Sequence, residues 1–344
     1  MPPHTGPLVS ILIPAFNAEA WIADTIRSAL AQTWPNKEVI VVDDGSQDRT
    51  LAVAKGFASR LLCVVTKANE GAAAARNTAF TLCQGRYIQW LDSDDLLSPD
   101  KVERQLGALR DEDDQRTLLS SPWGYFAHRP GRASFVPTSL WHDLAPVEWL
   151  VRKMGENLHM QTATWLTSRE LTEAAGPWDT RLLVDDDGEY FCRVLLASRG
   201  VRFVPEGKVY YRRVPSANRL SHIGTSNSKM DSLLLSMRLH IQYLCSLEKS
   251  PRVNEACLNY LRCWSNCFHP RRQDIGWELQ ALASEVGGQI EFPSLRRKYA
   301  WLRPVLGRDV AWRAQLALPE YKARVLFVLD KLLHAMQSGR RSLS

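Results

Sequence analysis

Residues 9–14 read VSILIP, a short apolar run of the kind that forms a buried strand. Similar runs recur at helix-length intervals, namely KEVIVVD at residues 37–43, LLCVV at 61–65 and YIQWL at 87–91. The segments between them, residues 18–32, 49–58 and 71–83, can each form an amphipathic helix. Strands that alternate with helices in this way are joined by right-handed crossovers and form a parallel sheet covered on both faces. We therefore predict an α/β fold with a doubly wound, mostly parallel sheet.

The rest of the chain divides into a loosely patterned middle part and a helical C-terminal part. Ser98, Pro99 and Asp100 are typical of a helix start, and this helix should run to about residue 110. Residues 117–224 hold short strands, loops rich in Pro and Gly, and one helix. Helical patterns follow at residues 228–247, 253–267 and 321–336, of which the last is basic and amphipathic. We expect a sheet-based domain over residues 1–224 and a helical extension over residues 225–344.

The composition limits the class of protein. A chain of 344 residues with 45% hydrophobic residues can bury one sizeable core. It contains no run of eighteen apolar residues, and its first seven residues lack the basic and apolar regions of a signal peptide. We therefore expect a cytoplasmic protein without a membrane span. The seven cysteines are expected to be reduced thiols, because their number is odd and no export signal is present.

The net charge of +6 is unevenly placed along the chain. Residues 291–344 hold eleven Lys/Arg and four Asp/Glu, so this stretch carries +7 and the remainder −1. A basic tail is typical of a solvated face, of a nucleic-acid contact or of docking on anionic lipid headgroups. The charge alone leaves these three interpretations open.

Polar residues follow all four predicted strands, and in a parallel sheet such strand ends meet at one edge, where ligands bind. The segments at these strand ends contain Pro14, Ala15, Phe16 and Asn17 at the first strand, Asp43 and Asp44 at the second, Lys67, Asn69 and Gly71 at the third, and Asp92, Ser93 and Asp94 at the fourth. Carboxylates gathered at one edge repel one another unless a metal, a basic side chain or a ligand hydroxyl lies among them. The sequence therefore predicts a ligand site at this edge.

Each of these groups also has a plain structural interpretation. Asp92 and Asp94 offer hard oxygen ligands suited to Mg²⁺ or Mn²⁺, but they can equally cap the next helix. Asp43 and Asp44 can accept hydrogen bonds from a base N–H or a ribose hydroxyl, or they can form an Asx-type turn. The small-residue helix start before Arg76 can face a phosphate, or it can simply pack tightly on the sheet.

Four segments, in their order and spacing, resemble the nucleotide-sugar half of the family 2 glycosyltransferases, a large family of inverting enzymes with the GT-A fold. They read VSILIPAFN, VVDDGSQDRT, KANEGAAAARN and WLDSDD and fall within residues 9–95. The resemblance implies a GT-A fold and transfer of a sugar from a nucleotide-diphosphate sugar, with a UDP-sugar favoured. It implies Mn²⁺ or Mg²⁺ as cofactor. It also implies that residues 1–97 bind the donor and residues 98–224 bind the acceptor.

The same resemblance implies roles for individual residues at the strand ends. Asp43 or Asp44 would contact the nucleotide base, and Arg76 would lie on the diphosphate side. Asp92 and Asp94 would contact the ribose and the metal.

The family's second half places an acidic catalytic base before a helix, usually as Glu-Asp followed six residues later by Arg. Residues 186–193 read DDGEYFCR, which fits that spacing with Asp187 as the base and Asp186 in the place of Glu. Such a base would deprotonate the acceptor hydroxyl. On their own, Asp185, Asp186 and Asp187 would be better explained as a helix cap. Trp178 and Asp179 match the family's approach to the base and would flank the acceptor.

His222 lies in the stretch where relatives often close the donor site with a loop. It could complete the metal shell or contact the diphosphate, and a solvated loop histidine is the alternative. The Gln-x-x-Arg-Trp signature of processive polysaccharide synthases is absent, and so are their membrane spans. This absence favours a single addition to a saccharide or lipid-linked acceptor, as in polysaccharide biosynthesis.

Lipid-linked acceptors are frequent in this family, so the basic tail is expected to dock peripherally on the inner face of the membrane. The residues expected to do so are Arg296, Arg297, Lys298, Arg303, Arg324 and Lys331.

No nucleic-acid partner is expected. The main alternative to an enzyme is a non-catalytic nucleotide-sugar-binding scaffold. A nucleotidyltransferase is less favoured, because no glycine-rich loop follows the first strand.

Overall fold

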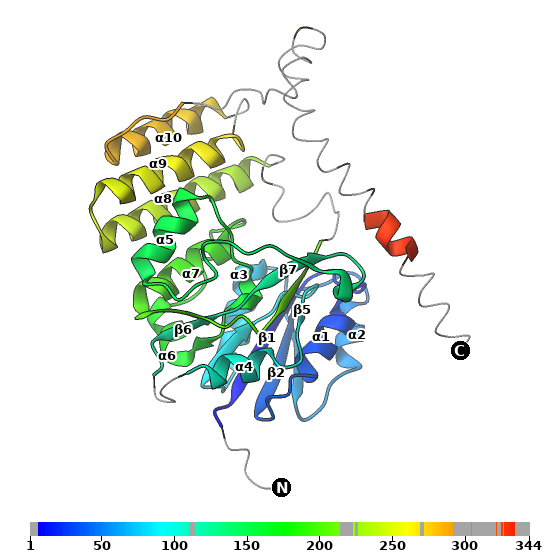
Figure 1. The fold of residues 1–344 in the computed structure, drawn as a ribbon. Coiled ribbons are helices and arrows are strands. Elements are labelled where there is room, and N and C mark those ends of the chain that lie inside the picture. Colours follow the sequence, from blue (N-terminus) through cyan, green and yellow to red (C-terminus); the bar gives the residue numbers. More distant parts are fainter. Residues whose placement is uncertain are drawn as a thin grey trace.

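The structure of the protein is a computed structural model with an α/β architecture (Figure 1). It describes residues 6–109, 114–213, 223, 226–268, 272–291, 304, 321, 325 and 327–333. The predicted boundary at residue 224 lies outside the described residues, and so does His222.

The central sheet has the strand order β3-β2-β1-β4-β9. Its strands are β1 (Val9–Ala15), β2 (Lys37–Asp43), β3 (Leu62–Thr66), β4 (Tyr87–Trp90) and β9 (Thr167–Ser168). Neighbours among β1 to β4 are parallel, whereas β9 is antiparallel to β4. Ala15 pairs with Asp43 and Asp43 with Thr66, so these strands end at the same level. The mostly parallel sheet is therefore confirmed, and β9 is an unpredicted edge strand from a distant part of the chain.

The side chains of β1 alternate between two hydrophobic layers, as period-two geometry requires. Ile11 and Ile13 pack with helices α1 (Ile22–Leu30) and α2 (Thr50–Lys55). Leu12 faces the other way, into the layer that contains helix α3 (Ala72–Leu82). Helices thus cover both faces of the sheet, as the sequence predicts. α1 begins four residues later than expected, because residues 17–21 form a turn that starts with Asn17 at a φ of +48°.

Two smaller sheets extend the structure beyond β4. One has the order β5-β11-β7-β8, and the other pairs β10 with β6. Their strands are β5 (Leu96–Leu97), β6 (Thr117–Ser120), β7 (Trp123–Phe126), β8 (Ser134–Phe135), β10 (Gly200–Phe203) and β11 (Val209–Arg212). The helices of this part are α4 (Lys101–Gly107), α5 (Pro146–Gly155), α6 (Arg169–Ala175) and α7 (Asp186–Ala197). Short 3₁₀ turns occur at Pro130–Arg132 and Thr162–Thr164.

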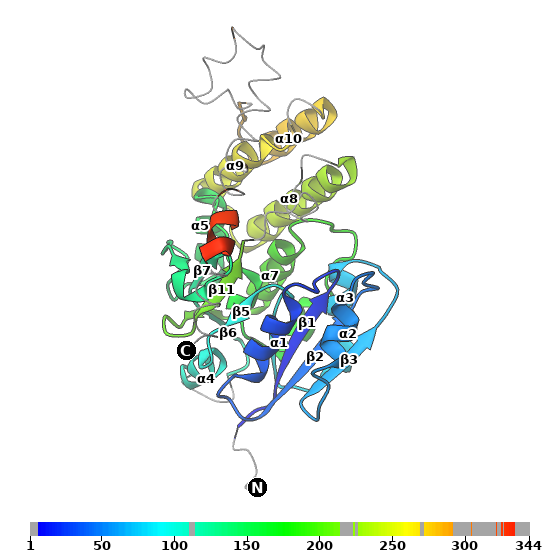
Figure 2. The ribbon, with the colours of Figure 1, turned by 90° about the vertical axis from the view of Figure 1, so that its right-hand side faces the viewer.

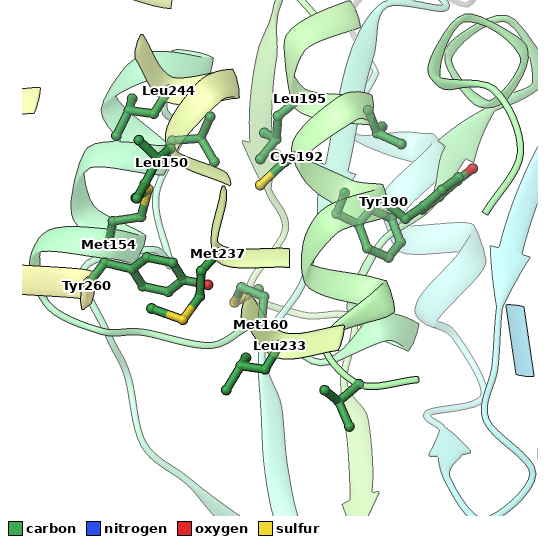
Figure 3. Packing of buried hydrophobic residues seen from close by; sticks show 14 of the residues in the cluster. Leu150, Met154, Met160, Tyr190, Cys192, Leu195, Leu233, Met237, Leu244 and Tyr260 are labelled. Carbon is green, nitrogen blue, oxygen red and sulfur yellow. The ribbon is translucent and has the colours of Figure 1, made fainter. Parts of the chain in front are cut away.

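The helical extension consists of α8 (Asn227–Leu247), α9 (Pro251–Ser265) and α10 (Gln273–Glu285). These helices lie beyond α7, at the end of the molecule away from β2 and β3 (Figures 1 and 2). They share a hydrophobic core with the rest of the chain (Figure 3). The core joins Leu150 and Met154 of α5, Cys192 of α7, Met237 of α8 and Tyr260 of α9.

The predicted basic helix at residues 321–336 is described in part. Residues 327–333 are helical and contact the loop after β7. Asp330 accepts hydrogen bonds from the backbone N–H of His128 at 3.0 Å and from Nε of Arg129 at 2.7 Å. Of the six residues expected to dock on lipid, only Lys331 is described.

Two further expectations concern the membrane and the thiols. Within the described residues, no helix combines the length and the apolar character needed to cross a bilayer. All seven cysteines are free thiols in the structure.

Trp90, the last residue of β4, anchors the strand that leads to the acidic loop at residues 92–95. Its ring is 1% exposed and lies 5.2 Å from the ring of Trp178 and 6.0 Å from that of Tyr190. We expect Trp90→Ala to lower the free energy of unfolding by about 3–5 kcal/mol through the cavity it leaves, measured by chemical denaturation. Trp277→Ala is the control: Trp277 is 74% exposed, and its loss should change the free energy by less than about 0.5 kcal/mol. Equal losses for both variants would contradict this account of the core.

Candidate functional site

Arg76 lies at the centre of the candidate site. It belongs to α3 and is 5% exposed. Its Nη2 donates to Oδ1 of Asp92 at 2.8 Å, and its Nη1 donates to Oδ2 of Asp186 at 2.6 Å. The guanidinium also lies over the ring of Trp178, 4.4 Å from its centroid. One buried cation therefore joins the acidic loop after β4 to the acidic start of α7.

Asp186 and Asp187 begin α7 but have different surroundings. Burial raises the pKa of Asp186 to about 6 against the opposing charge of Arg76, and the charges of Asp187 and Asp92 add to the rise. Asp187 instead accepts a hydrogen bond from Oγ1 of Thr162 at 3.0 Å through its Oδ2. Asp186 is thus paired with Arg76, whereas Asp187 is hydrogen-bonded to the segment before β9.

Asp43 ends β2 and Asp44 follows it, and both side chains are buried. Asp44 accepts hydrogen bonds from Nζ of Lys67 at 3.1 Å and from the backbone N–H of Gly71 at 2.8 Å. Asp43 uses Oδ2 to accept from the backbone N–H of Ser46 at 3.3 Å, which is the Asx-type turn considered above. Its Oδ1 is buried without a hydrogen-bond partner among the described residues. Asp43 therefore keeps one buried acceptor oxygen without a partner among the described residues, whereas Asp44 organises the loop after β3.

The loops after β1 and β2 hold each other at the same edge. The backbone N–H of Asn17 donates to Oγ of Ser46, and Oδ1 of Asn17 accepts from the backbone N–H of Gln47, both at 2.9 Å. Pro14 and Ala15 are buried in β1, whereas the Phe16 side chain is 47% exposed at the strand end. Asn69 is also exposed, on the neighbouring loop. The structure thus brings the predicted residues of all four strand ends to one edge.

The acidic loop after β4 is held from inside by Asp95. This side chain is fully buried and accepts hydrogen bonds from Nε2 of Gln161 at 2.6 Å and from the backbone N–H of Arg212 at 2.7 Å. Burial raises its pKa well above the ordinary range, and the charges of Asp94 and Asp92 act in the same direction. Asp95 is therefore a structural support of the loop.

Asp92, Ser93 and Asp94 are only partly buried in this loop. No group of three or more His, Cys, Asp or Glu side chains in the described part of the chain is arranged to hold a metal ion. Of the predicted metal set, Asp92 and Asp94 are described, whereas His222 lies outside the described residues. These two carboxylates provide the hard oxygen donors that Mg²⁺ and Mn²⁺ prefer.

The structure corrects the prediction for Trp178. Its side chain is 2% exposed and stacks on Tyr190 with 4.0 Å between ring centroids. The ring therefore supports Arg76 from the core and offers no open face to an acceptor. Asp179 lies nearer the surface, in an ion pair with Arg181 at 2.6 Å. A short motif could not distinguish a tryptophan that binds a sugar from one that packs under the site.

Comparison with known proteins identifies a family that matches part of this chain. Residues 10–129, less than half of the chain, match the model of the family described as glycosyl transferase family 2. The uncharacterized glycosyltransferase EpsJ of Bacillus subtilis is 30% identical over 219 residues, which are 61% of this chain and 62% of EpsJ. The chondroitin synthase of Escherichia coli is 45% identical over 106 residues, 30% of this chain and 16% of the synthase.

The chain matches only part of the length of these curated relatives. The match spans 36% of the uncharacterized glycosyltransferase RT0329 of Rickettsia typhi, at 40% identity and over 33% of this chain. Among solved structures, S. aureus TarS 1–349 in complex with UDP-GlcNAc has a TM-score of 0.65 and 17% identity, covering 94% of this chain and 91% of TarS. Mannosyltransferase PcManGT from Pyrobaculum calidifontis, solved with GDP-Man and Mn²⁺, has a TM-score of 0.54 and 19% identity, covering 96% and 89%. These similarities confirm the predicted GT-A type of fold.

Gln161 and Thr162, near Asp187, were not predicted from the sequence, and neither was the grouping of aromatic side chains beside them. Thr162 and Gln161 hold Asp187 and Asp95, and an aromatic group lies beside them. This group consists of Trp123, Tyr125, His159 and Tyr211, whose rings lie 4.9 to 6.4 Å apart in contacting pairs. Alternation along β7 and β11 could have placed Tyr125 and Tyr211 on one face. The position of residues 159–162 depends on long-range packing, which no local pattern reveals.

The raised pKa of Asp186 predicts that the free energy of unfolding depends on pH. Its folded-state pKa of about 6 exceeds the ordinary value of 3.8, so the folded protein binds the proton more tightly than the unfolded chain. This contribution to stability is present below the pKa of Asp186 in the unfolded chain. It is lost as the pH rises through the pKa of Asp186 in the folded protein. We expect Asp186→Asn to remove that component from the pH dependence of unfolding, measured by denaturation across this interval. Asp231→Asn on exposed α8 surface is the control, and parallel curves for wild type and Asp186→Asn would contradict the assignment.

Proposed function

We propose that this protein is an inverting, metal-assisted glycosyltransferase that moves a sugar from a nucleotide-diphosphate donor to a hydroxyl of a saccharide or lipid-linked acceptor. The observation that carries this proposal is the double ion pair of Arg76. It holds Asp92 of the donor-side loop and Asp186 of the predicted base segment on one guanidinium. This pairing supports a proposed donor site that lies next to the proposed base segment, as a displacement at the anomeric carbon requires.

The proposed donor site follows the four strand ends. Asp43 has a buried carboxylate oxygen without a partner among the described residues, and it is our candidate for the base N–H of the nucleotide. The surrounding loops would enclose the donor through Pro14, Ala15, Phe16, Asn17, Asp44, Lys67, Asn69, Gly71 and Ser93. A UDP-sugar is the favoured donor, and the fold similarity to TarS, which was solved with UDP-GlcNAc, supports this choice.

Arg76 receives a role that differs from the one implied by the resemblance. Both of its terminal nitrogens are used by Asp92 and Asp186, and its Nε is buried without a partner among the described residues. We therefore propose that Arg76 acts by holding the two carboxylates in place. In this role Arg76 lies beside the proposed diphosphate position, and its charge offsets part of the repulsion between Asp92 and Asp186.

Asp92 and Asp94 would hold Mn²⁺ or Mg²⁺. The bound metal would supply positive charge that stabilises the departing nucleoside diphosphate. The similarity in fold to PcManGT, which was solved with GDP-Man and Mn²⁺, supports this part of the proposal. His222 stays a candidate third ligand.

Asp187 is our candidate for the general base. Thr162 holds one of its oxygens, and its neighbour Asp186 is already neutralised by Arg76. The aromatic group beside this segment offers ring faces on which an acceptor sugar could stack, in place of Trp178.

Docking of the basic tail on a membrane stays a proposal that rests on the charge of residues 291–344.

The base assignment can be tested with Asp187→Asn. The amide keeps the shape of the side chain but cannot accept the proton, so we expect transfer to fall by a factor on the order of 10²–10⁴. Affinity for the donor should stay near that of the wild type. The measurement is a transfer assay with a panel of UDP- and GDP-sugars, Mn²⁺ and sugar acceptors. Asp274→Asn, on the far helix α10, is the matched control, and near-normal turnover of Asp187→Asn would exclude Asp187 as the base.

The metal assignment can be tested with Asp94→Ala. Titration calorimetry of UDP with and without Mn²⁺ should show metal-dependent binding to the wild type. The variant should lose on the order of tenfold or more of that affinity, because ligand removal costs at least as much as loss of an outer-shell partner. Binding without metal should change little. Equal metal dependence in Asp94→Ala and in the control Asp274→Ala would exclude Asp94 as a ligand.

A further inference from the structure

Helix α8 carries a line of polar side chains along a face that is buried in the core. Ser232, Ser236, His240 and Tyr243 follow one another at intervals of four, four and three residues, which places them on one side of the helix. Ser236 and His240 are fully buried, and Ser232 is 5% exposed. Burying a polar group without a hydrogen-bond partner costs free energy of folding. The hydrogen bonds of these side chains therefore indicate what the buried polar face of α8 holds in place.

Three side chains of this line, those of Ser232, Ser236 and Tyr243, have partners just before α7 or in its first turn. Oγ of Ser236 donates to Oδ2 of Asp185 at 2.7 Å. Oγ of Ser232 accepts from the backbone N–H of Leu183 at 2.8 Å. The hydroxyl of Tyr243 donates to Oε1 of Glu189 at 2.7 Å. α8 therefore holds the chain immediately before and after Asp186 and Asp187.

His240 connects this line to a third helix. Burial, together with the nearby charge of Lys153, lowers the pKa of His240 to about 4, so its ring is neutral near pH 7. The neutral ring can accept from Nζ of Lys153 of α5 through Nε2 at 3.0 Å. It then donates from Nδ1 to the backbone oxygen of Ser236 at 2.8 Å. Tyr260 of α9 adds a hydroxyl 3.4 Å from Oδ2 of Asp185.

The conformation that these contacts hold is an unusual one. Asp185 has a φ of +55°, a left-handed conformation that non-glycine residues adopt only when their surroundings impose it. A Cβ atom at position 188 would collide with the Asp185 carboxylate, so a side chain there would displace this carboxylate. The turn before α7 is therefore strained and has its stabilising contacts on α8 and α9.

We propose that Ser232, Ser236 and Tyr243 of α8 form a clamp that positions the proposed catalytic base. The clamp fixes Asp185 and Glu189, and so sets where Asp186 meets Arg76 and where Asp187 meets Thr162. The helical extension is then a working part of the active site. This inference rests on the proposed function for the role of Asp187, but the clamp on the α7 start is a property of the structure itself.

Ser236→Ala tests the clamp, with Ser265→Ala as the matched control. Ser265 is equally buried, but its hydroxyl donates within α9 to the backbone oxygen of Arg262. The first measurement is hydrogen–deuterium exchange of the full chain. Ser236→Ala should speed exchange in residues 183–190, because the strained turn loses a direct contact. Ser265→Ala should leave this segment at the wild-type rate.

The second measurement is transfer with the donor and acceptor that the wild type uses. Ser236→Ala should lower kcat by roughly 10- to 100-fold, since small displacements of a catalytic group are costly, while the donor KM stays near the wild-type value. Unchanged exchange in residues 183–190 would overturn the clamp, and so would equal kcat losses in both variants. A wild type that transfers no sugar would instead count against the proposed function, and the exchange data would still decide the clamp.

Discussion

The double ion pair of the Arg76 guanidinium is the interaction on which the rest of the site depends. Two carboxylates that come from distant parts of the chain, Asp92 and Asp186, meet on this one buried side chain. Taking these charges out of water is expensive, and losing one partner would leave an uncompensated charge in the core. The loop after β4 and the start of α7 are therefore fixed relative to α3.

The packing around Arg76 continues through the hydrophobic core to the C-terminal helices. Trp178 lies under Arg76 and stacks on Tyr190 of α7, and Tyr190 belongs to the cluster that continues into α8 and α9 (Figure 3). The polar contacts of Ser236 and Tyr260 reach the turn before α7 from the opposite side. The site is thus held by contacts from the sheet and by contacts from the helical extension. These two parts of the chain also share one hydrophobic core.

The sequence predicted well those features that depend on local pattern. Strands β1 to β4 and helices α1 to α3 follow from apolar periodicity, and the shared edge of Asp43 and Asp92 follows from parallel topology. Pairings across the chain could not be predicted in the same way. The contact of Arg76 with Asp186 spans 110 positions, and β9 joins the sheet from residue 167 onward. The polar line on α8 is visible as a spacing, but only the fold shows that it meets Asp185.

The central claim is that the strand-end carboxylates form a donor site and that the Arg76 ion pairs place Asp187 beside it. A crystal structure of the protein with UDP-GlcNAc and Mn²⁺ tests this claim most directly. The account predicts metal density against Asp92 and Asp94, the nucleotide base beside Asp43, and the Asp187 carboxylate on the sugar side of the diphosphate. A nucleotide bound away from the strand ends, or an Asp187 carboxylate that points away from the bound sugar, would contradict it.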